Sequence, residues 1–230
     1  MLVTESQIDL RLKCPMSEIA DKCPSAYGCA QKLLKWAIVE AFKGRLVPVA
    51  ILRGKFEHLW TGHTSNWATD HQDGFYAGLR LGNTAAKRIY LFLQHYEILK
   101  PVEAYRFDCE GDQVEGEYAV VLQRHDRRTD ARPMILQIHE QRLYRFMQPP
   151  CATELIRYVH LMTTTDYTSP EVYHLPLFSG NPWTMKAFEL PLVRAAVRSI
   201  LGAVRNIEHP VSGSHCEDCI GKRCRSLAHG

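Results

Sequence analysis

The cysteines near the end of the chain place the strongest constraint on its fold. Cys216, Cys219 and Cys224 follow one another with the spacing C-x2-C-x4-C, which is typical of thiolates that bind one metal ion or cluster. Gly221 gives the backbone freedom between the second and third cysteine. Three thiolates leave a tetrahedral site one ligand short, so the sequence predicts that another part of the chain supplies the fourth.

The fourth ligand has several candidates. Cys23 is the first choice, because it precedes a proline at the expected start of a helix, where backbone N–H groups stabilise a thiolate. Cys14 and Cys29 are alternatives in the same region, and His215 or His229 would complete a zinc site within the C-terminal segment. With Cys23 as the ligand, the metal would join the two ends of the chain.

The composition is that of a globular chain long enough for one domain. The chain has 230 residues, of which 46% are hydrophobic and 23% are charged. No apolar run approaches the roughly 18 residues of a membrane span, and the N-terminus lacks the apolar segment of a secretory signal. We therefore expect a cytoplasmic protein, in which eight cysteines favour metal binding over disulfides. The net charge of +3 does not by itself indicate nucleic acid binding.

Apolar periodicity predicts helices towards both ends of the chain and strands in the middle. Helices are expected over 17–42, 151–162 and 185–207. Strands are expected over 102–111, 114–124 and 132–146. The last two strands are separated by a polar segment, so they are predicted to form a hairpin. This order favours a single α/β domain with a small mixed sheet flanked by helices.

Three further segments have less regular patterns. Residues 47–60 begin with the composition of a strand and become helical after Gly54. Residues 85–100 are predicted to form a helix, either throughout or running into a strand. Residues 163–183 are rich in turn-forming residues, and no strand is predicted there.

Basic residues cluster in the polar segment of the predicted hairpin. This segment contains four arginines, Arg124, Arg127, Arg128 and Arg132. If it contacts DNA, the guanidinium groups would bind phosphates and give affinity without sequence readout. The alternative is a solvated hairpin tip, because Asp126 and Asp130 are interspersed among them. The expected C-terminal helix adds Arg194, Arg198 and Arg205.

The order of these features resembles a known nuclease family. The sequence Cys-Pro-x-x-Tyr near the N-terminus, together with three C-terminal cysteines, resembles the iron–sulfur branch of the RecB-like PD-(D/E)XK nucleases. That branch includes the AddB nuclease domain and the CRISPR-associated RecB-like exonucleases. The resemblance implies a 4Fe-4S cluster, with zinc as the alternative, held by Cys23, Cys216, Cys219 and Cys224. It also implies one restriction-endonuclease-like domain over 1–230, with an iron–sulfur subdomain formed by about 14–45 and 185–226.

Two further motifs follow in the order of the family. RGKFEHLW at 53–60 resembles its G-x-x-x-H helix, in which the resemblance implies that His58 contacts the catalytic metal. ELIRYV at 154–159 resembles its Q-x-x-x-Y helix, with Glu154 in place of glutamine and Tyr158 retained. The predicted hairpin between these motifs corresponds to the strands that carry the family's catalytic residues.

The catalytic strands depart from the family pattern. Ala119 stands where the family has the aspartate of Gly-x-x-Asp, and Gln137 and His139 replace the residues of (Asp/Glu)-x-Lys. Cleavage of DNA needs carboxylates that hold Mg²⁺ or Mn²⁺ near the phosphate, and alanine and glutamine do not supply them. A substitute site of His58, Glu117 and His139, binding Mn²⁺ or Zn²⁺, is the alternative.

The shifted sequence Glu140-Gln141-Arg142 offers a second possible replacement for (Asp/Glu)-x-Lys. Its odd offset from Gln137 would turn Glu140 and Arg142 towards the core side of the strand. The sequence therefore favours a degenerate active site over a displaced one.

Three functions are consistent with these patterns. The first is a catalytically degenerate nuclease-fold subunit that binds DNA within a DNA-processing or CRISPR-type antiviral assembly, with other protein subunits as partners. The second is an active Mg²⁺- or Mn²⁺-dependent single-strand exonuclease that uses the substitute ligands. The third is a scaffold that binds only proteins. No membrane association is expected.

Overall fold

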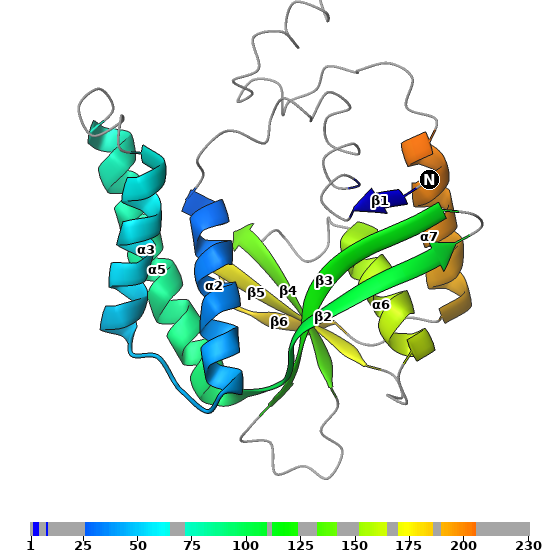
Figure 1. Ribbon diagram of the computed structural model, residues 1–230, viewed down its shortest axis with the longest axis horizontal. Helices are drawn as coiled ribbons and strands as arrows, with labels where there is room; N and C mark the ends of the chain where they lie inside the picture. The colour runs from blue at the N-terminus through cyan, green and yellow to red at the C-terminus, as the bar shows by residue number, and fades with distance from the viewer. Residues whose placement is uncertain are drawn as a thin grey trace, which may run out of the picture.

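The computed structural model describes residues 2–4, 8, 26–64, 72–109, 112–123, 133–141, 152–164, 170–185 and 190–205. These residues form a mixed sheet with helices on both faces (Figure 1). One face is covered by α2 (Ala26–Phe42) and α5 (Gln72–His95), and α3 (Val49–Thr64) packs against these two helices. The other is covered by α6 (Ala152–Thr164) and α7 (Leu190–Arg205). None of the helices in the described ranges is long and apolar enough to cross a bilayer.

In the described part of the chain six strands make up the sheet, and three of them pair with β3. The strands are β1 (Leu2–Thr4), β2 (Tyr96–Cys109), β3 (Asp112–Gln123), β4 (Met134–Gln141), β5 (Glu171–Ser179) and β6 (Trp183–Met185). One edge of β3 pairs with antiparallel β2. Its other edge is shared by parallel β1 and antiparallel β4. Beyond β4 the sheet continues with parallel β5 and then antiparallel β6.

The alternation of side chains along β3 divides the apolar residues between two cores. Ala119 and Val121 lie in the core on the side of α2 and α5, whereas Tyr118 and Val120 lie in the core on the side of α6 and α7. Because both faces of the sheet are covered, every central strand buries residues in both directions. The two helical layers therefore flank one mixed sheet, as the sequence predicts.

Most of the predicted elements are present. The hairpin prediction is confirmed by the antiparallel pairing of Ala119–Val121 with Met134–Leu136. The segment 85–100 runs from helix into strand, because α5 ends at His95 and β2 begins at Tyr96. The predicted C-terminal helix is α7, although residue 185 belongs to β6.

The prediction of a strand-like start for residues 47–60 is wrong. Helix α3 begins at Val49, and the Pro48 carbonyl accepts hydrogen bonds from the N–H groups of Ile51 and Leu52. Leu52, Phe56 and Trp60 are buried at helical spacing within the core beside α5. Tertiary burial of this stripe outweighs the strand propensity of the apolar residues at its start.

The sequence predicts no strand within residues 163–183, and this prediction is also wrong. Residues Glu171–Ser179 form β5, in which every side chain from Val172 to Phe178 is buried. A strand next to a parallel neighbour and covered on both faces has no polar alternation, so its pattern does not look like a half-exposed strand. Pro176 lies next to the irregularity of register between β4 and β5, where a missing N–H is tolerated.

Candidate metal centre

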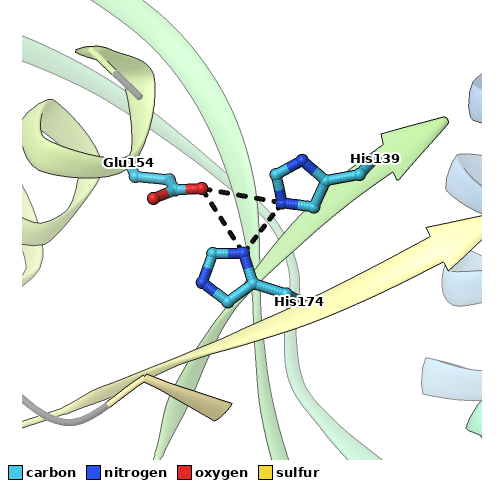
Figure 2. A group of neighbouring side chains, drawn as sticks. All are labelled: His139, Glu154 and His174. Atoms are coloured by element: carbon cyan, nitrogen blue, oxygen red, sulfur yellow. Dashed lines mark hydrogen bonds and ion pairs between the residues drawn. The ribbon is translucent and has the colours of Figure 1, made fainter. Parts of the chain in front are cut away.

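Three side chains that bind metals in many proteins meet on the face of the sheet below α6. Figure 2 shows His139 of β4, His174 of β5 and Glu154 of α6 pointing towards one another. His139 Nε2 lies 2.8 Å from His174 Nδ1. Glu154 Oε1 lies 3.6 Å from the first of these nitrogens and 3.4 Å from the second. We call this group the His–Glu–His cluster.

The fold brings the cluster together through one parallel strand pair and its connecting helix. His174 lies opposite Gln137 in the β4–β5 register, so His139 is two residues further along the neighbouring strand on the same face. Glu154 lies in the first turn of α6, where the helix N-terminus favours negative charge. A crossover helix must lie over the strands that it joins, and this places Glu154 above both imidazoles.

Burial controls the protonation of His174. Its side chain is 2% exposed, and among the described residues no group forms a hydrogen bond with its Nε2. Burial, followed by the neighbouring charge of His139, lowers the pKa of His174 to about 3. His174 is therefore neutral at pH 7, which is the form of imidazole that binds metal ions.

The cluster is closed on one side by an aromatic ring. Trp183 of β6 stacks on His174 with a centroid distance of 4.5 Å and on His139 with a distance of 5.3 Å. Glu154 is only 3% exposed, whereas the His139 side chain is 17% exposed. Solvent therefore reaches the cluster on the His139 side.

A charged hydrogen bond lies beside the cluster. Arg157, one turn after Glu154 on α6, donates a hydrogen bond of 2.7 Å from Nη1 to Oε1 of Gln137. Gln137 is buried, so this bond satisfies an amide oxygen that would otherwise be costly to bury. Gln137 therefore has a guanidinium partner at the position where the nuclease resemblance expects a metal-binding carboxylate.

The donor atoms suit a metal ion of intermediate softness. Two imidazole nitrogens and one carboxylate oxygen lie within 4.8 Å of one another. Such a ligand set is found around zinc and other first-row transition metals, whereas Mg²⁺ and Ca²⁺ prefer oxygen ligands alone. The cluster could therefore hold a metal ion.

The structure separates the residues of the substitute site expected from the sequence. Glu117 lies on the opposite face of the sheet from His139; it is 50% exposed and forms a 3.0 Å ion pair with Lys35 of α2. His58 is exposed on α3, in the helical layer on that same opposite face. A metal site made of His58, Glu117 and His139 is therefore not assembled.

The register also moves Ala119 away from the cluster. Ala119 pairs with Leu136, and both are buried in the core below α2 and α5. Gln137 and His139 share the other face, as the sequence predicts. On β3 that face carries Tyr118, whose hydroxyl is hydrogen-bonded to His160 Nδ1 at 3.0 Å. No carboxylate of the described part of β3 reaches the cluster.

The remaining predicted site residues divide into two groups. Tyr158 is completely buried in the core between the sheet and α6, so its position is consistent with packing. Cys29 is also buried, and burial raises the pKa of its thiol, which disfavours the thiolate that a metal ligand needs. The others lie outside the described residues: Cys14, Cys23, Cys216, Cys219, Cys224, Arg124, Arg127, Arg128, Arg132 and Arg142.

Sequence reasoning missed His174 as a site residue. The signal that could have found it is a single imidazole within the run of apolar residues from Val172 to Phe178. A polar side chain in such a run is buried and needs polar partners. Recognising the run as a strand was the necessary first step, because only the pairing with β4 brings His174 to His139.

Comparisons with known proteins do not assign the chain to a family. No family model matches it, and no curated protein matches it. A solved structure described as the crystal structure of SSO0001 has a TM-score of 0.37 and 8% sequence identity, covering 70% of this chain and 77% of that chain. A likeness at this level carries no argument about fold or function.

Proposed function

We propose that this protein is a catalytically degenerate nuclease-fold protein of the RecB-like PD-(D/E)XK type that binds DNA as part of a larger assembly. The proposal rests on the side chains that stand at the family's catalytic positions in the hairpin formed by β3 and β4. At the position of the family's (Asp/Glu)-x-Lys, Gln137 is bonded to Arg157, and His139 belongs to a cluster with one carboxyl group. The order of α3, hairpin and α6 along the chain supports the resemblance.

The chemistry of phosphodiester cleavage explains why this arrangement favours binding over catalysis. Mg²⁺ and Mn²⁺ are held by several oxygen ligands near the scissile phosphate, with an open position for water. Here Glu154 supplies a single carboxyl group that is almost completely buried, and Glu117 is engaged with Lys35 on the opposite face. A DNA strand would have to reach a site that Trp183 covers on one side.

Helix α7 offers a basic surface for the phosphate backbone. Val193, Val197 and Leu201 of this helix are buried, whereas Arg194 and Arg198 are exposed one turn apart. Exposed guanidinium groups at this spacing can contact successive phosphates. The arginines of residues 124–132 would extend such a surface.

We also propose that Cys23, Cys216, Cys219 and Cys224 hold a 4Fe-4S cluster. The start of α2 and the end of α7 lie at the same end of the molecule in Figure 1. Cys23 precedes the start of α2, and the three C-terminal cysteines follow the end of α7. The N-terminal and C-terminal cysteines are therefore connected in sequence to helix termini that both lie at the top of the view in Figure 1, on opposite faces of the sheet.

Nuclease activity is expected to be absent. Anaerobically purified protein should leave labelled single-stranded and duplex DNA intact in the presence of Mg²⁺ or Mn²⁺, because Ala119 and Gln137 stand where the family has the carboxylates that hold these ions. A gel-based digestion assay measures this. Robust cleavage that is abolished by His58→Ala would contradict the proposal and favour an active exonuclease.

DNA binding is expected to depend on salt and on α7. Replacing both Arg194 and Arg198 by alanine should weaken binding of single-stranded or duplex DNA and lower the salt slope by about two. Fluorescence anisotropy at several salt concentrations measures both quantities. The matched control replaces Arg53 and Arg80, which are exposed on the helices of the opposite layer. Wild-type protein that does not bind DNA even at low salt would favour a protein-binding scaffold.

A further inference from the structure

The His–Glu–His cluster is not used by the proposed DNA binding. We propose that it binds one Zn²⁺ ion, with His139 Nε2, His174 Nδ1 and one carboxylate oxygen of Glu154 as the ligands from this chain. Its ligands are not the cysteines of the proposed cluster, and the site does not depend on the proposed function, because it rests only on the described residues of β4, β5 and α6.

The distances between the donor atoms are close to those around a tetrahedral zinc ion. Ligands at about 2.1 Å from zinc are about 3.4 Å apart in a tetrahedron. The two separations that involve Glu154 Oε1 are 3.4 and 3.6 Å. The nitrogen–nitrogen separation of 2.8 Å is shorter, so the two rings would move apart by about half an ångström to admit the ion. Side-chain rotation at the partly exposed His139 can supply this movement.

The orientation of the rings favours direct coordination by these nitrogens. Figure 2 shows His139 Nε2 and His174 Nδ1 turned towards each other and towards the carboxyl group of Glu154. The stacking of Trp183 on both rings, with an interplanar angle of 1° to His174, holds them in this orientation. A site whose ligands are already oriented loses less conformational entropy when the ion binds.

The charge and type of the ligands select the metal. The carboxylate oxygen of Glu154 adds one negative charge to two neutral imidazole donors, and this combination suits a divalent ion. Two of three donors are imidazole nitrogens, which favour zinc over Mg²⁺, and zinc accepts four-coordinate geometry. Solvent on the His139 side can supply the fourth ligand as water.

Zinc at this position would join three elements of one core. It would fix the end of β4 to β5 and both strands to the first turn of α6. The three ligands come together only in the folded chain. The free energy of zinc binding therefore adds to the free energy of unfolding. We therefore expect the bound ion to stabilise the folded chain.

Metal analysis of the full-length protein tests the proposal. The protein is purified anaerobically, dialysed against Zn²⁺ and then against metal-free buffer, and analysed for zinc and iron by mass spectrometry. His174→Gln and Glu154→Gln should each lose about one zinc per chain relative to the wild type, with iron unchanged. The matched control is His160→Gln, which should retain zinc. His160 is also a buried histidine, but it lies on α6 and is hydrogen-bonded to Tyr118.

Two further measurements keep the test decisive if a buried variant fails to fold. His139→Gln changes a partly exposed ligand and should also lose one zinc. In the wild type, Co²⁺ in place of zinc should give the visible absorption of a tetrahedral ion without thiolate charge transfer. Co²⁺ should also quench the fluorescence of Trp183, and the loss of this quenching in Trp183→Phe would assign it to that residue. Unchanged zinc in all three ligand variants, or no zinc in the wild type, would overturn the proposal. If the ligand variants lose iron or manganese and keep their zinc, the choice of zinc would be overturned.

Discussion

Replacing Gly82 by alanine is expected to destabilise the protein by about 3 kcal/mol. A Cβ atom at this position would lie 2.0 Å from ring atoms of Phe56, far inside van der Waals contact. Phe56 is buried and stacks on Trp60, so its ring has little room to move. Helices α3 and α5 would have to separate, and the core between them would lose packing contacts. Urea unfolding followed by circular dichroism measures the change.

The same helices provide controls. Gly78→Ala should have a similar effect, because its Cβ would lie 2.3 Å from the Trp60 ring. Gly54→Ala on α3 meets nothing within 4 Å and should stabilise the protein by up to about 1 kcal/mol through helix propensity. Phe56→Ala should lower the cost of Gly82→Ala in a double-mutant cycle. A Gly82→Ala protein as stable as the wild type would contradict the packing of α3 against α5.

Replacing Cys216 by serine is expected to remove the iron and make the protein poorly soluble. The proposed cluster joins the segment before α2 to the segment after α7, so its loss frees both ends of the chain. Iron analysis should give about four irons per wild-type chain, with absorption near roughly 400 nm.

Variants of the N-terminal cysteines complete this test. Cys23→Ser should behave as Cys216→Ser does, whereas Cys14→Ser and Cys29→Ala should retain the iron. The prediction for Cys29 follows from its burial in the core of α2, where burial raises the pKa of its thiol. A soluble, folded Cys216→Ser protein with its iron intact would contradict the cluster. A colourless wild type with one zinc that depends on Cys216 would replace it with a zinc knuckle.

The candidate site was predictable from the sequence only in part. The alternation of β4 places Gln137 and His139 on one face, because successive side chains of a strand point to opposite sides. The family resemblance also includes Glu154 on the following helix. The third ligand was not predicted, since His174 lies in a strand whose continuous burial hides the period of two.

The register of the sheet decided which of the predicted residues meet. Glu117 and His139 both lie in the predicted hairpin, and the sequence alone allowed them to share a site. Ala119 pairs with Leu136, so the face of β3 that carries Glu117 is the opposite face from His139. A shift of the register by one residue would place Glu117 and His139 on the same face. The register is fixed by the burial of both faces of the sheet.

The helical and strand periods, the hairpin and the common face of Gln137 and His139 could be predicted from the sequence, because they depend on local geometry. Tertiary structure alone decided that residues 49–54 are helical, that 171–179 form a strand, and that His139, Glu154 and His174 converge. The parallel pairing of β4 with β5 and the crossing of α6 above them bring residues distant in sequence to one point. Such contacts depend on the burial of whole faces and cannot be read from any single segment.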